Sequence, residues 1–219
     1  MKTASLNRRN LILGTSLLAA SALTLSVFAG GASADPFPGN PAPAFTGLTA
    51  TGESVSLSDF SGQTVILEWT NHDCPFVVKH YNHGSTIPDL QARAAEEGHV
   101  WLQIISSAPG TQGHVSADEA IELNVQRGAS PAHVILDESG VIGRAYDART
   151  TPHMFIIDGE GVIQYAGAID DQPSANPDSL DGALNYVSQA LDEMAAGLPV
   201  SINETRPYGC SVKYADAES

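Results

Sequence analysis

Basic residues are scarce in this sequence. Its 219 residues include 10 Lys and Arg against 25 Asp and Glu, a formal net charge of −15. Three of the bases, Lys2, Arg8 and Arg9, lie in the first 34 residues, which hold no acid, so residues 35–219 carry 7 bases and a net charge of −18. Such a surface repels nucleic acid and anionic membranes. The expected partners are therefore small molecules or other proteins.

Cysteine is scarcer still, with Cys74 and Cys210 as the two examples. Two cysteines in an oxidising compartment permit a disulfide without proving one. About 185 residues after the first 34 are enough to bury a core without that bridge. A local C-x-x-C dithiol is also missing, because Val77 stands three residues after Cys74. The two cysteines are therefore candidates for chemistry as well as for structure.

A long uncharged run occurs at the N-terminus, from Leu11 to Phe28. A short basic opening precedes it, and Ala32-Ser33-Ala34 forms a small-x-small cleavage site before Asp35. This layout predicts that residues 1–34 are a signal peptide. The pair Arg8-Arg9 indicates a twin-arginine-like signal, with the general secretory route as the alternative. We expect a periplasmic or secreted protein without a stable membrane anchor after cleavage; an uncleaved anchor is the competing interpretation.

The exported part is expected to form one domain. Residues 35–44 are proline-rich and predict an extended lead-in. Residues 45–197 form the predicted domain, and residues 198–219 a C-terminal tail that carries Cys210. No composition break or internal repeat divides this region further.

Apolar runs and turn residues predict the elements of the domain. The expected strands are 64–69, 100–106, 133–136, 154–157 and 162–165, preceded by a hairpin within 45–57. A broken helical region is expected from 76 to 97, interrupted at Gly84 and Pro88. A capping box of Ser116 and Glu119 opens a helix that ends near Gly128, and a final amphipathic helix is expected over 179–196. The order predicts a sheet that is parallel in its first half, closed by a hairpin and covered by helices on both faces.

Three segments carry a resemblance to a known family: LSDFSGQTVILEW followed by TNHDCPF, VILDESGVIGRAY, and TPHMFIIDGEGVIQYAG. In this order they resemble the thioredoxin-fold redoxins, which include peroxiredoxin-like alkyl hydroperoxide reductases and periplasmic thiol–disulfide oxidoreductases. The resemblance covers about residues 36–197 and implies an α/β thioredoxin-like fold with a central mixed sheet. DCPxV near the start and GCxxKY near the end resemble one redoxin subgroup in particular.

Cys74 has a chemical role on physical grounds as well. A thiol where a strand gives way to a helix faces backbone N–H groups and the positive end of the helix dipole, which favour the nucleophilic thiolate. Lys79 and His80 are in reach to add positive charge, whereas Asp73 opposes ionisation. The alternative is a buried, inert cysteine.

The resemblance also assigns Pro152. In thioredoxin-fold proteins a cis-proline lies against the active-site cysteine, and Thr151-Pro152 matches its place. An ordinary trans turn proline is the alternative.

Two departures from the family pattern concern the surroundings of Cys74. Asn71 stands where peroxiredoxins carry threonine or serine, and the position of their active-site arginine is taken by Pro152. Thr70 and Arg149 are close in sequence to those positions but out of register.

Cys210 is the expected resolving partner in TRPYGCSVKY. In this mechanism Cys74 attacks a peroxide or a disulfide, and the tail swings in so that Cys210 resolves the intermediate. A permanent Cys74–Cys210 bridge is the alternative, and by chain entropy it adds roughly 4–5 kcal/mol.

Metal binding is the competing function. His72, Cys74, His80 and His83 cluster in sequence, His153 is expected to lie nearby, and thiolate with imidazole suits copper or zinc.

The sequence thus predicts an exported thiol oxidoreductase that needs no cofactor, with a peroxide or protein disulfide as substrate and a thiol reductant, such as another thioredoxin-fold protein, as partner. The candidate catalytic residues are Cys74, Cys210 and Pro152, supported by Thr70, Asn71, His72, Asp73, Pro75, Thr151 and Arg149.

Overall fold

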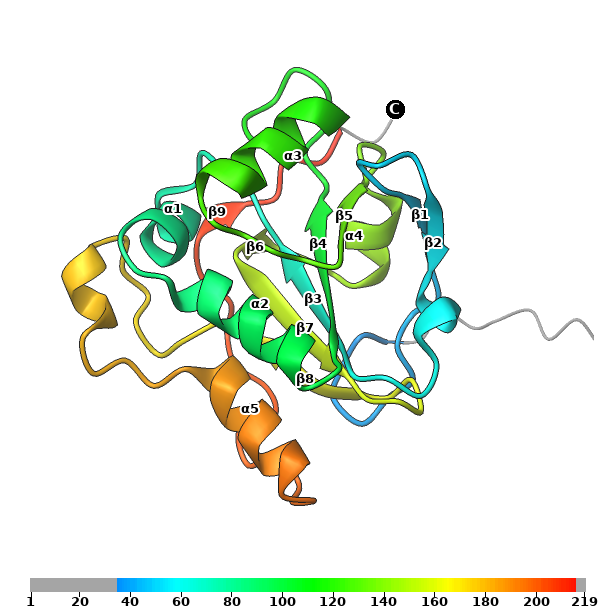
Figure 1. The fold of residues 1–219 in the computed structure, drawn as a ribbon, viewed down its shortest axis with the longest axis vertical. Coiled ribbons are helices and arrows are strands. Elements are labelled where there is room, and N and C mark those ends of the chain that lie inside the picture. The colour runs from blue at the N-terminus through cyan, green and yellow to red at the C-terminus, as the bar shows by residue number, and fades with distance from the viewer. Residues whose placement is uncertain (1–34, 216–219) are drawn as a thin grey trace, which may run out of the picture. The chain divides into compact units, whose positions relative to one another are not determined.

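The computed structural model describes residues 35–215 and contains a five-stranded sheet in the order β5-β4-β3-β7-β8 (Figure 1). These strands are β3 (Val65–Trp69), β4 (Val100–Ile105), β5 (His133–Leu136), β7 (His153–Ile157) and β8 (Ile163–Gly167). β3 pairs in parallel with β4, and β4 with β5, whereas β7 lies antiparallel to both β3 and β8. The mixed sheet of a thioredoxin-like fold is thereby confirmed.

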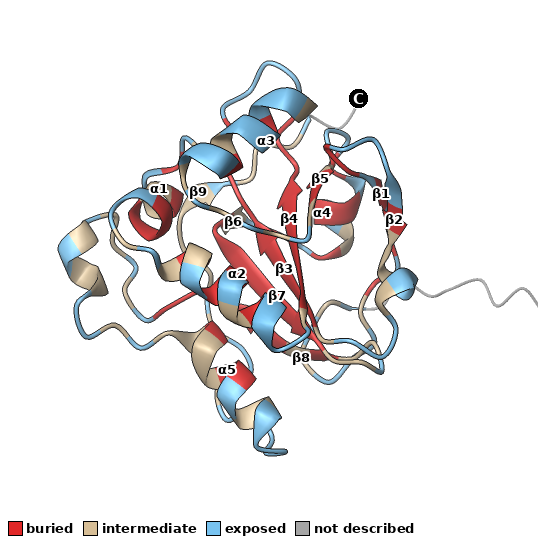
Figure 2. Cartoon of the chain, viewed as in Figure 1, coloured by how far each residue is buried: buried red, intermediate tan, exposed pale blue. Residues whose placement is uncertain are grey.

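Helices cover the sheet on both faces. They are α1 (Pro75–Asn82), α2 (Thr86–Glu96), α3 (Ala117–Gln126), α4 (Val141–Ala145) and α5 (Tyr186–Ala195), with 3-10 turns η1 (Leu57–Phe60) and η2 (Pro177–Leu180). Residues of α1, α2 and α5 pack on the face that carries Ile66 and Met154. The opposite face, with Leu67 and Phe155, is covered by α4 and the N-terminal hairpin. Figure 2 shows the strands buried between these layers, because every residue of β3, β4 and β7 is buried from solvent.

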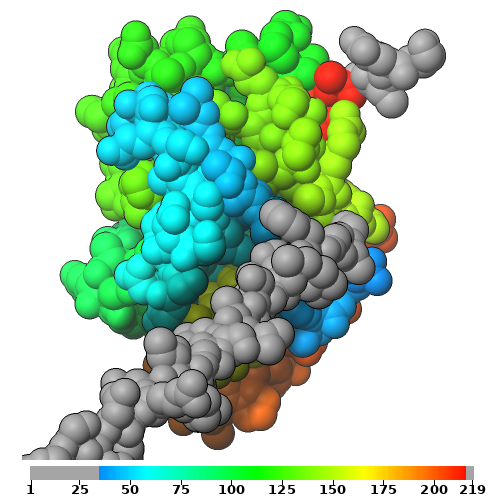
Figure 3. Space-filling view, turned by 90° about the vertical axis from the view of Figure 1, so that its right-hand side faces the viewer, coloured from blue at the N-terminus to red at the C-terminus, as the bar shows by residue number. Residues whose placement is uncertain are grey.

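The hairpin consists of β1 (Thr46–Leu48) and β2 (Ser54–Ser56), which agrees with the sequence prediction. Figure 3 shows it in blue to cyan beside the yellow-green segment around α4. Gly47 permits this approach, because a Cβ there would lie 2.5 Å from Ile135 Cγ2 and 3.1 Å from Ile142 Cδ1. The proline-rich lead-in runs alongside β8, where Gly39 N donates to Ile163 O.

The helical prediction for 76–97 was right about Gly84 and wrong about Pro88. Gly84 lies between α1 and α2. Pro88 instead lies in the first turn of α2, where a missing N–H breaks no helical hydrogen bond. The capping box of Ser116 and Glu119 opens α3 as expected.

The final helix is shorter than predicted. Residues 177–180 form the separate turn η2, and α5 begins at Tyr186, where the Asn185 side chain accepts a hydrogen bond from Ser188 N. Gly182, with a φ of +72°, lies between the two elements. The predicted helix began too early because Leu184 fits the helical spacing of apolar residues, although its side chain is 42% exposed.

The tail after α5 is part of the fold. Thr205 N donates to Ala166 O, Val212 N to Arg149 O, and Ala108 N to Lys213 O. Its strand β9 (Cys210–Ser211) pairs with β6 (Thr150–Thr151). Cys210 therefore lies in a tail that is held against the domain by backbone hydrogen bonds. The predicted signal peptide, residues 1–34, lies outside the described residues. Within residues 35–215, no helix combines the length and apolar character needed to span a bilayer.

The corrected start of α5 predicts different effects for two leucines. Leu191 is 1% exposed, so Leu191→Ala should lower the free energy of unfolding by about 2–5 kcal/mol. Leu184→Ala removes an exposed side chain and should cost less than about 1 kcal/mol. Urea unfolding of both variants measures the difference, and equal losses would contradict the boundary at Tyr186.

Candidate active site

Cys74 lies at the N-cap of α1, immediately before Pro75 at the first helical position. The segment that leads to it is fixed by Asn71, whose side-chain Oδ1 accepts from Asp73 N at 2.9 Å and whose carbonyl accepts from Cys74 N at 3.1 Å. Pro75 suits the first turn because its missing N–H has no partner within the helix. The strand-to-helix junction expected from the sequence is therefore present.

The sulfur of Cys74 is buried between two backbone groups. Cys74 is 0% exposed, and its Sγ lies 3.1 Å from Thr151 O, to which the thiol donates. The amide of Cys210 donates to the same Sγ at 3.4 Å. No N–H group of α1 bonds to the sulfur, so the expected support from the helix amides is replaced by an amide of the tail.

The carbonyl beside Cys74 belongs to the Thr151-Pro152 dipeptide. Its peptide bond is cis, as the resemblance implied. Thr151 is directly opposite Cys210 in the β6–β9 ladder, and its hydroxyl donates to Cys210 O at 3.4 Å. The cis-proline segment therefore contacts both cysteines.

Gly209 allows the tail to come this close. Its φ is +132°, and a Cβ at this position would lie 2.0 Å from Thr151 O. A real Cβ cannot be accommodated at that distance, because the obstacle is backbone. The glycine before Cys210 is thus required for the approach of the two cysteines.

The Cys210 thiol is partly exposed, and both cysteines are present as free thiols. Burial raises the pKa of Cys210 to about 11, and the hydrogen bond and charge of Cys74 add to that rise, while Lys213 opposes it. A negative charge on Cys74 therefore disfavours a second one on Cys210. Near neutral pH, Cys210 remains a thiol.

Four side chains hold the tail near α1, and we call them the Asp170 cluster: Lys79, His80, Asp170 and Tyr208. Tyr208 donates a hydrogen bond to Asp170 Oδ1. Lys79 Nζ lies 3.6 Å from Asp170 Oδ2 and 3.3 Å from Tyr208 OH, and His80 Nε2 is 3.3 Å from the same hydroxyl. The expectation that Lys79 and His80 would direct charge toward Cys74 is wrong, because both contact Asp170 instead.

Burial governs the protonation of this cluster. Desolvation lowers the pKa of Lys79, although Asp170 opposes that change. Desolvation and the neighbouring Lys79 lower the pKa of His80 to about 3. His80 is therefore neutral in the folded protein at neutral pH.

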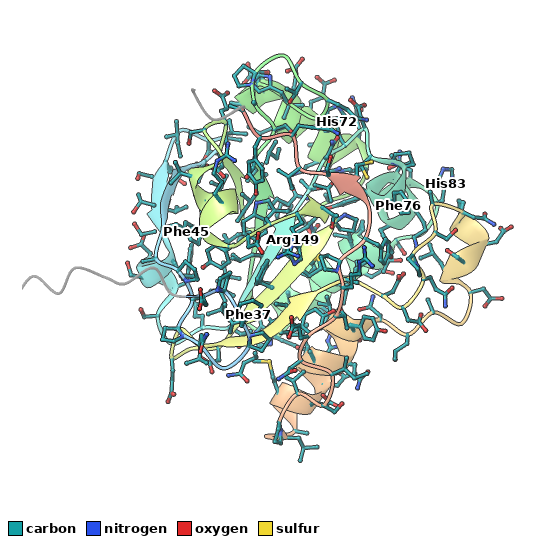
Figure 4. All side chains as sticks on the ribbon, turned by 180° about the vertical axis from the view of Figure 1, so that it is seen from behind. Phe37, Phe45, His72, Phe76, His83 and Arg149 are labelled. Atoms are coloured by element: carbon teal, nitrogen blue, oxygen red, sulfur yellow. The ribbon has the colours of Figure 1, made fainter. Side chains whose placement is uncertain are left out.

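Of the remaining residues predicted to support the site, several lie close to Cys74 and Arg149 does not. Asn71 supports the loop, while the Thr70 hydroxyl is buried with no hydrogen-bond partner among the described residues. The His72 Nε2 atom lies 3.3 Å from Asp73 Oδ1. Arg149 was also expected to support the site, but its side chain is 69% exposed and its guanidinium pairs with Asp147. Figure 4 shows Arg149 well apart from His72 and Phe76, the labelled residues on either side of Cys74 in sequence.

The alternative metal ligands are not brought together. His80 faces the Asp170 cluster, and His153 is buried against Phe155 with its ring 4.7 Å away. Within the described part of the chain, no three His, Cys, Asp or Glu residues are arranged to hold a metal ion. The structure therefore does not assemble the proposed metal ligands into one site; these were His72, Cys74, His80, His83 and His153.

Sequence reasoning missed a second buried polar network below α1. Glu68 on β3 is 0% exposed, and its carboxylate accepts from Tyr81 OH at 2.8 Å and from Trp101 Nε1 at 2.9 Å. The only signal in the sequence was a charged residue within the apolar run TVILEW. The Asp170 cluster gave no signal of this kind, because Asp170 and Tyr208 lie in polar segments.

Gly209→Ala should displace the tail from Thr151. Because the Cβ would meet backbone, we expect disulfide formation between Cys74 and Cys210 to slow by about 100-fold, as for a shift of about 1 Å in reacting groups. The rate is measured by quenched alkylation after oxidation. The control is Gly182→Ala, where φ is also positive but no atom lies within 4 Å. Equal effects of the two changes would contradict the role assigned to Gly209.

The buried histidines predict a loss of stability in acid. Burial lowers the pKa of His153, like that of His80, to about 3, against 6.5 for an exposed histidine. Between pH 6.5 and 3 the unfolded chain therefore binds protons that the folded chain does not, so stability falls as pH falls through that window. Each histidine contributes a slope of about 1.4 kcal/mol per pH unit. Urea unfolding at several pH values should show that the free energy of unfolding depends less steeply on pH in His153→Gln than in the unmodified chain. Equal slopes would contradict the role assigned to His153.

Comparison with known structures shows the same fold. A structure of an uncharacterized conserved protein from Geobacillus kaustophilus is 25% identical, with a TM-score of 0.69, and the match covers 83% of this chain and 94% of that one. A hypothetical protein from Sinorhizobium meliloti 1021 is 20% identical, with a TM-score of 0.68 and coverage of 81% and 94%. A putative protein disulfide isomerase from Bacteroides thetaiotaomicron is 19% identical, with a TM-score of 0.50 and coverage of 70% and 87%.

No curated protein matches this chain. The family described as Redoxin matches residues 37–184, which include Cys74, Thr151, Pro152 and all five strands of the main sheet. The chain belongs to the Redoxin family, with a thioredoxin-like fold.

Proposed function

We propose that this protein is an exported, peroxiredoxin-like thiol oxidoreductase in which Cys74 is the nucleophile and Cys210 the resolving cysteine. Family membership supports the broad class of thiol oxidoreductase. One observation carries the finer assignment: the cysteines are 136 residues apart in sequence, yet the Cys210 amide lies 3.4 Å from Cys74 Sγ. Export by residues 1–34 remains part of the proposal and accords with a pair of cysteines that can form a disulfide.

The proposed reaction has two steps. The Cys74 thiolate attacks one oxygen of a peroxide, the O–O bond breaks, and the leaving alkoxide or hydroxide takes a proton; Cys74 becomes a sulfenic acid. The Cys210 thiol then attacks that sulfur, releasing water and forming the Cys74–Cys210 disulfide. A dithiol reductant returns both cysteines to thiols and becomes a disulfide itself.

Burial of Cys74 supports a small oxidant. Its sulfur is 0% exposed beneath the tail, so a disulfide within a folded protein cannot reach it without displacing Cys210 and Thr151. A peroxide contributes only two oxygen atoms at the reacting centre and needs a far smaller opening. Peroxide reduction is therefore favoured over disulfide exchange as the step at Cys74.

The resolving step needs no swing of the tail. The earlier expectation of a swinging tail is replaced by a docked one, because β9 already pairs with β6 in the thiol form. A resolving thiol held beside its target reacts at a high effective concentration. Cys210 remains protonated until it attacks, which agrees with its raised pKa.

Peroxide treatment of the reduced mature protein tests this function. One equivalent of hydrogen peroxide should produce the Cys74–Cys210 disulfide within seconds, followed by mass spectrometry after acid quench and alkylation. In Cys210→Ser, Cys74 should be trapped as a sulfenic acid by a dimedone-type reagent. Cys74→Ser should react with peroxide no faster than free cysteine.

Two outcomes would contradict the proposal. Thiols that ignore peroxide would remove the peroxidase function. A disulfide that forms but resists reduction by a dithiol in the folded state would identify a structural bridge instead.

A further inference from the structure

A half-buried arginine, Arg127, faces a hollow between the neighbouring helices α1 and α3 (Figure 1). Among residues 35–215 it pairs with no carboxylate, whereas Arg93 and Arg149 each do. The hollow has a volume of about 450 Å³, a size typical of small-molecule sites, and neither cysteine lines it. We call it the Arg127 pocket, and its lining residues are His72, Val78, Tyr81, Asn82, Leu123, Gln126 and Arg127.

Two neighbours fix the guanidinium of Arg127. Its central carbon lies 3.9 Å from the centroid of the Tyr81 ring, which gives a cation–π contact. Its Nε and Nη2 atoms both donate to Asn124 Oδ1, at 3.2 and 2.8 Å. A guanidinium has five N–H groups, so these two bonds leave three, on Nη1 and Nη2. One N–H from each of these nitrogens forms a parallel pair, which is the geometry that binds both oxygens of a carboxylate.

The groups that hold Arg127 are themselves fixed by the buried network around Glu68. Glu68 accepts from Tyr81 OH, and Gln103 Nε2 donates to the same hydroxyl. Gln103 Oε1 accepts from Asn124 Nδ2 at 2.8 Å. A continuous chain of hydrogen bonds therefore runs from the sheet to the side chain that holds the arginine. A binding group that is fixed in advance loses less freedom when a ligand arrives, which favours affinity.

We propose that the Arg127 pocket binds a small monocarboxylate with a short apolar body. The carboxylate accepts two hydrogen bonds from the open edge of Arg127, and the apolar body lies on Val78 and Leu123, which line the same hollow. This site is separate from the thiol chemistry, because neither cysteine lines the pocket. The inference therefore does not rest on the proposed function.

The charges around the pocket favour a ligand with one negative charge. Arg127 supplies one positive charge in a chain whose net charge is −15. Gln126 Nε2 donates to Glu122 Oε1 at 3.0 Å, and Glu119 and Glu122 line an adjoining hollow that shares Gln126 with the Arg127 pocket. A dianion such as sulfate would be repelled by these carboxylates. A neutral ligand would leave the open edge of the guanidinium unused.

Titration with simple acids tests the inference. Acetate, butyrate, hexanoate and benzoate are added to the reduced mature protein at constant pH and ionic strength, and the NMR signals of the Arg127 Nε–H and the Tyr81 ring are followed. We expect saturable binding of hexanoate or benzoate with a Kd of about 10 mM or lower. The uncharged hexanamide and benzamide should bind at least about tenfold more weakly, because they lack the charge that Arg127 pairs with.

A pair of arginine variants assigns the binding to Arg127. Arg127→Gln removes the open edge and should weaken binding of the acid by about tenfold or more. Arg144→Gln is the matched control, because the Arg144 guanidinium is also stacked on a tyrosine, 4.5 Å from the Tyr214 ring centroid, but Arg144 is exposed. The control should leave the Kd unchanged.

A second pair keeps Arg127 and fills the pocket, so it decides the question even if Arg127→Gln does not fold. Val78→Trp should weaken binding of the acid by about tenfold or more, because the ring occupies the space of the apolar body. Val125→Trp, an equally large addition to a residue of α3 that is 76% exposed, should not.

Four results would overturn the inference. The first is that none of the four acids saturates the signals by about 100 mM. The second is equal affinity for the acids and their amides. The third is tighter binding of sulfate than of every acid. The fourth is an unchanged Kd in Val78→Trp or in a folded Arg127→Gln.

Discussion

The site depends on one packing constraint: the tail must lie against the cis-proline segment, so that Cys74 Sγ is placed between Thr151 O and the Cys210 amide. Cys74 comes from the β3–α1 junction, Thr151 from β6, and Cys210 from a strand that follows the last helix. No two of these segments are neighbours in the sequence. Removing the tail would expose Cys74, take away the Cys210 amide that donates to its sulfur and separate it from its proposed resolving partner.

The Asp170 cluster holds the tail in this position, although it requires a charged side chain to be buried. In a chain of net charge −15, one of its 10 Lys and Arg residues, Lys79, is entirely buried. A buried ion pair is weak support for stability, because desolvation of both charges opposes their attraction. Its contribution here is position: Asp170 accepts from Tyr208, Tyr208 packs on Phe76 of α1, and Cys210 follows two residues later. Hydrophobic replacements would fill the space without fixing the tail in this register.

The sequence was sufficient for the sheet and for the position of Cys74. Short apolar runs identify buried strands whatever their neighbours, and the proline directly after Cys74 is favoured at the first turn of a helix. Local patterns failed where distant residues decide the outcome. Lys79 and His80 were expected to face Cys74, but Asp170, some 90 residues later, attracts both. Leu184 continued the helical period, yet Asn185 caps the helix one residue later. The docking of the tail could not be foreseen, since two-residue strands such as β6 and β9 have no periodicity to detect.

Amide hydrogen exchange of the reduced mature protein tests the docked tail most directly. Val212 N donates to Arg149 O and Thr205 N to Ala166 O, so both amides should exchange slowly, with protection like that of β8. The Cys210 amide, bonded to Cys74 Sγ, should be protected as well and should lose protection in Cys74→Ala. Exchange of all three at the rate of an unfolded peptide would show that the tail is undocked in the thiol form, and the account of the site would be wrong.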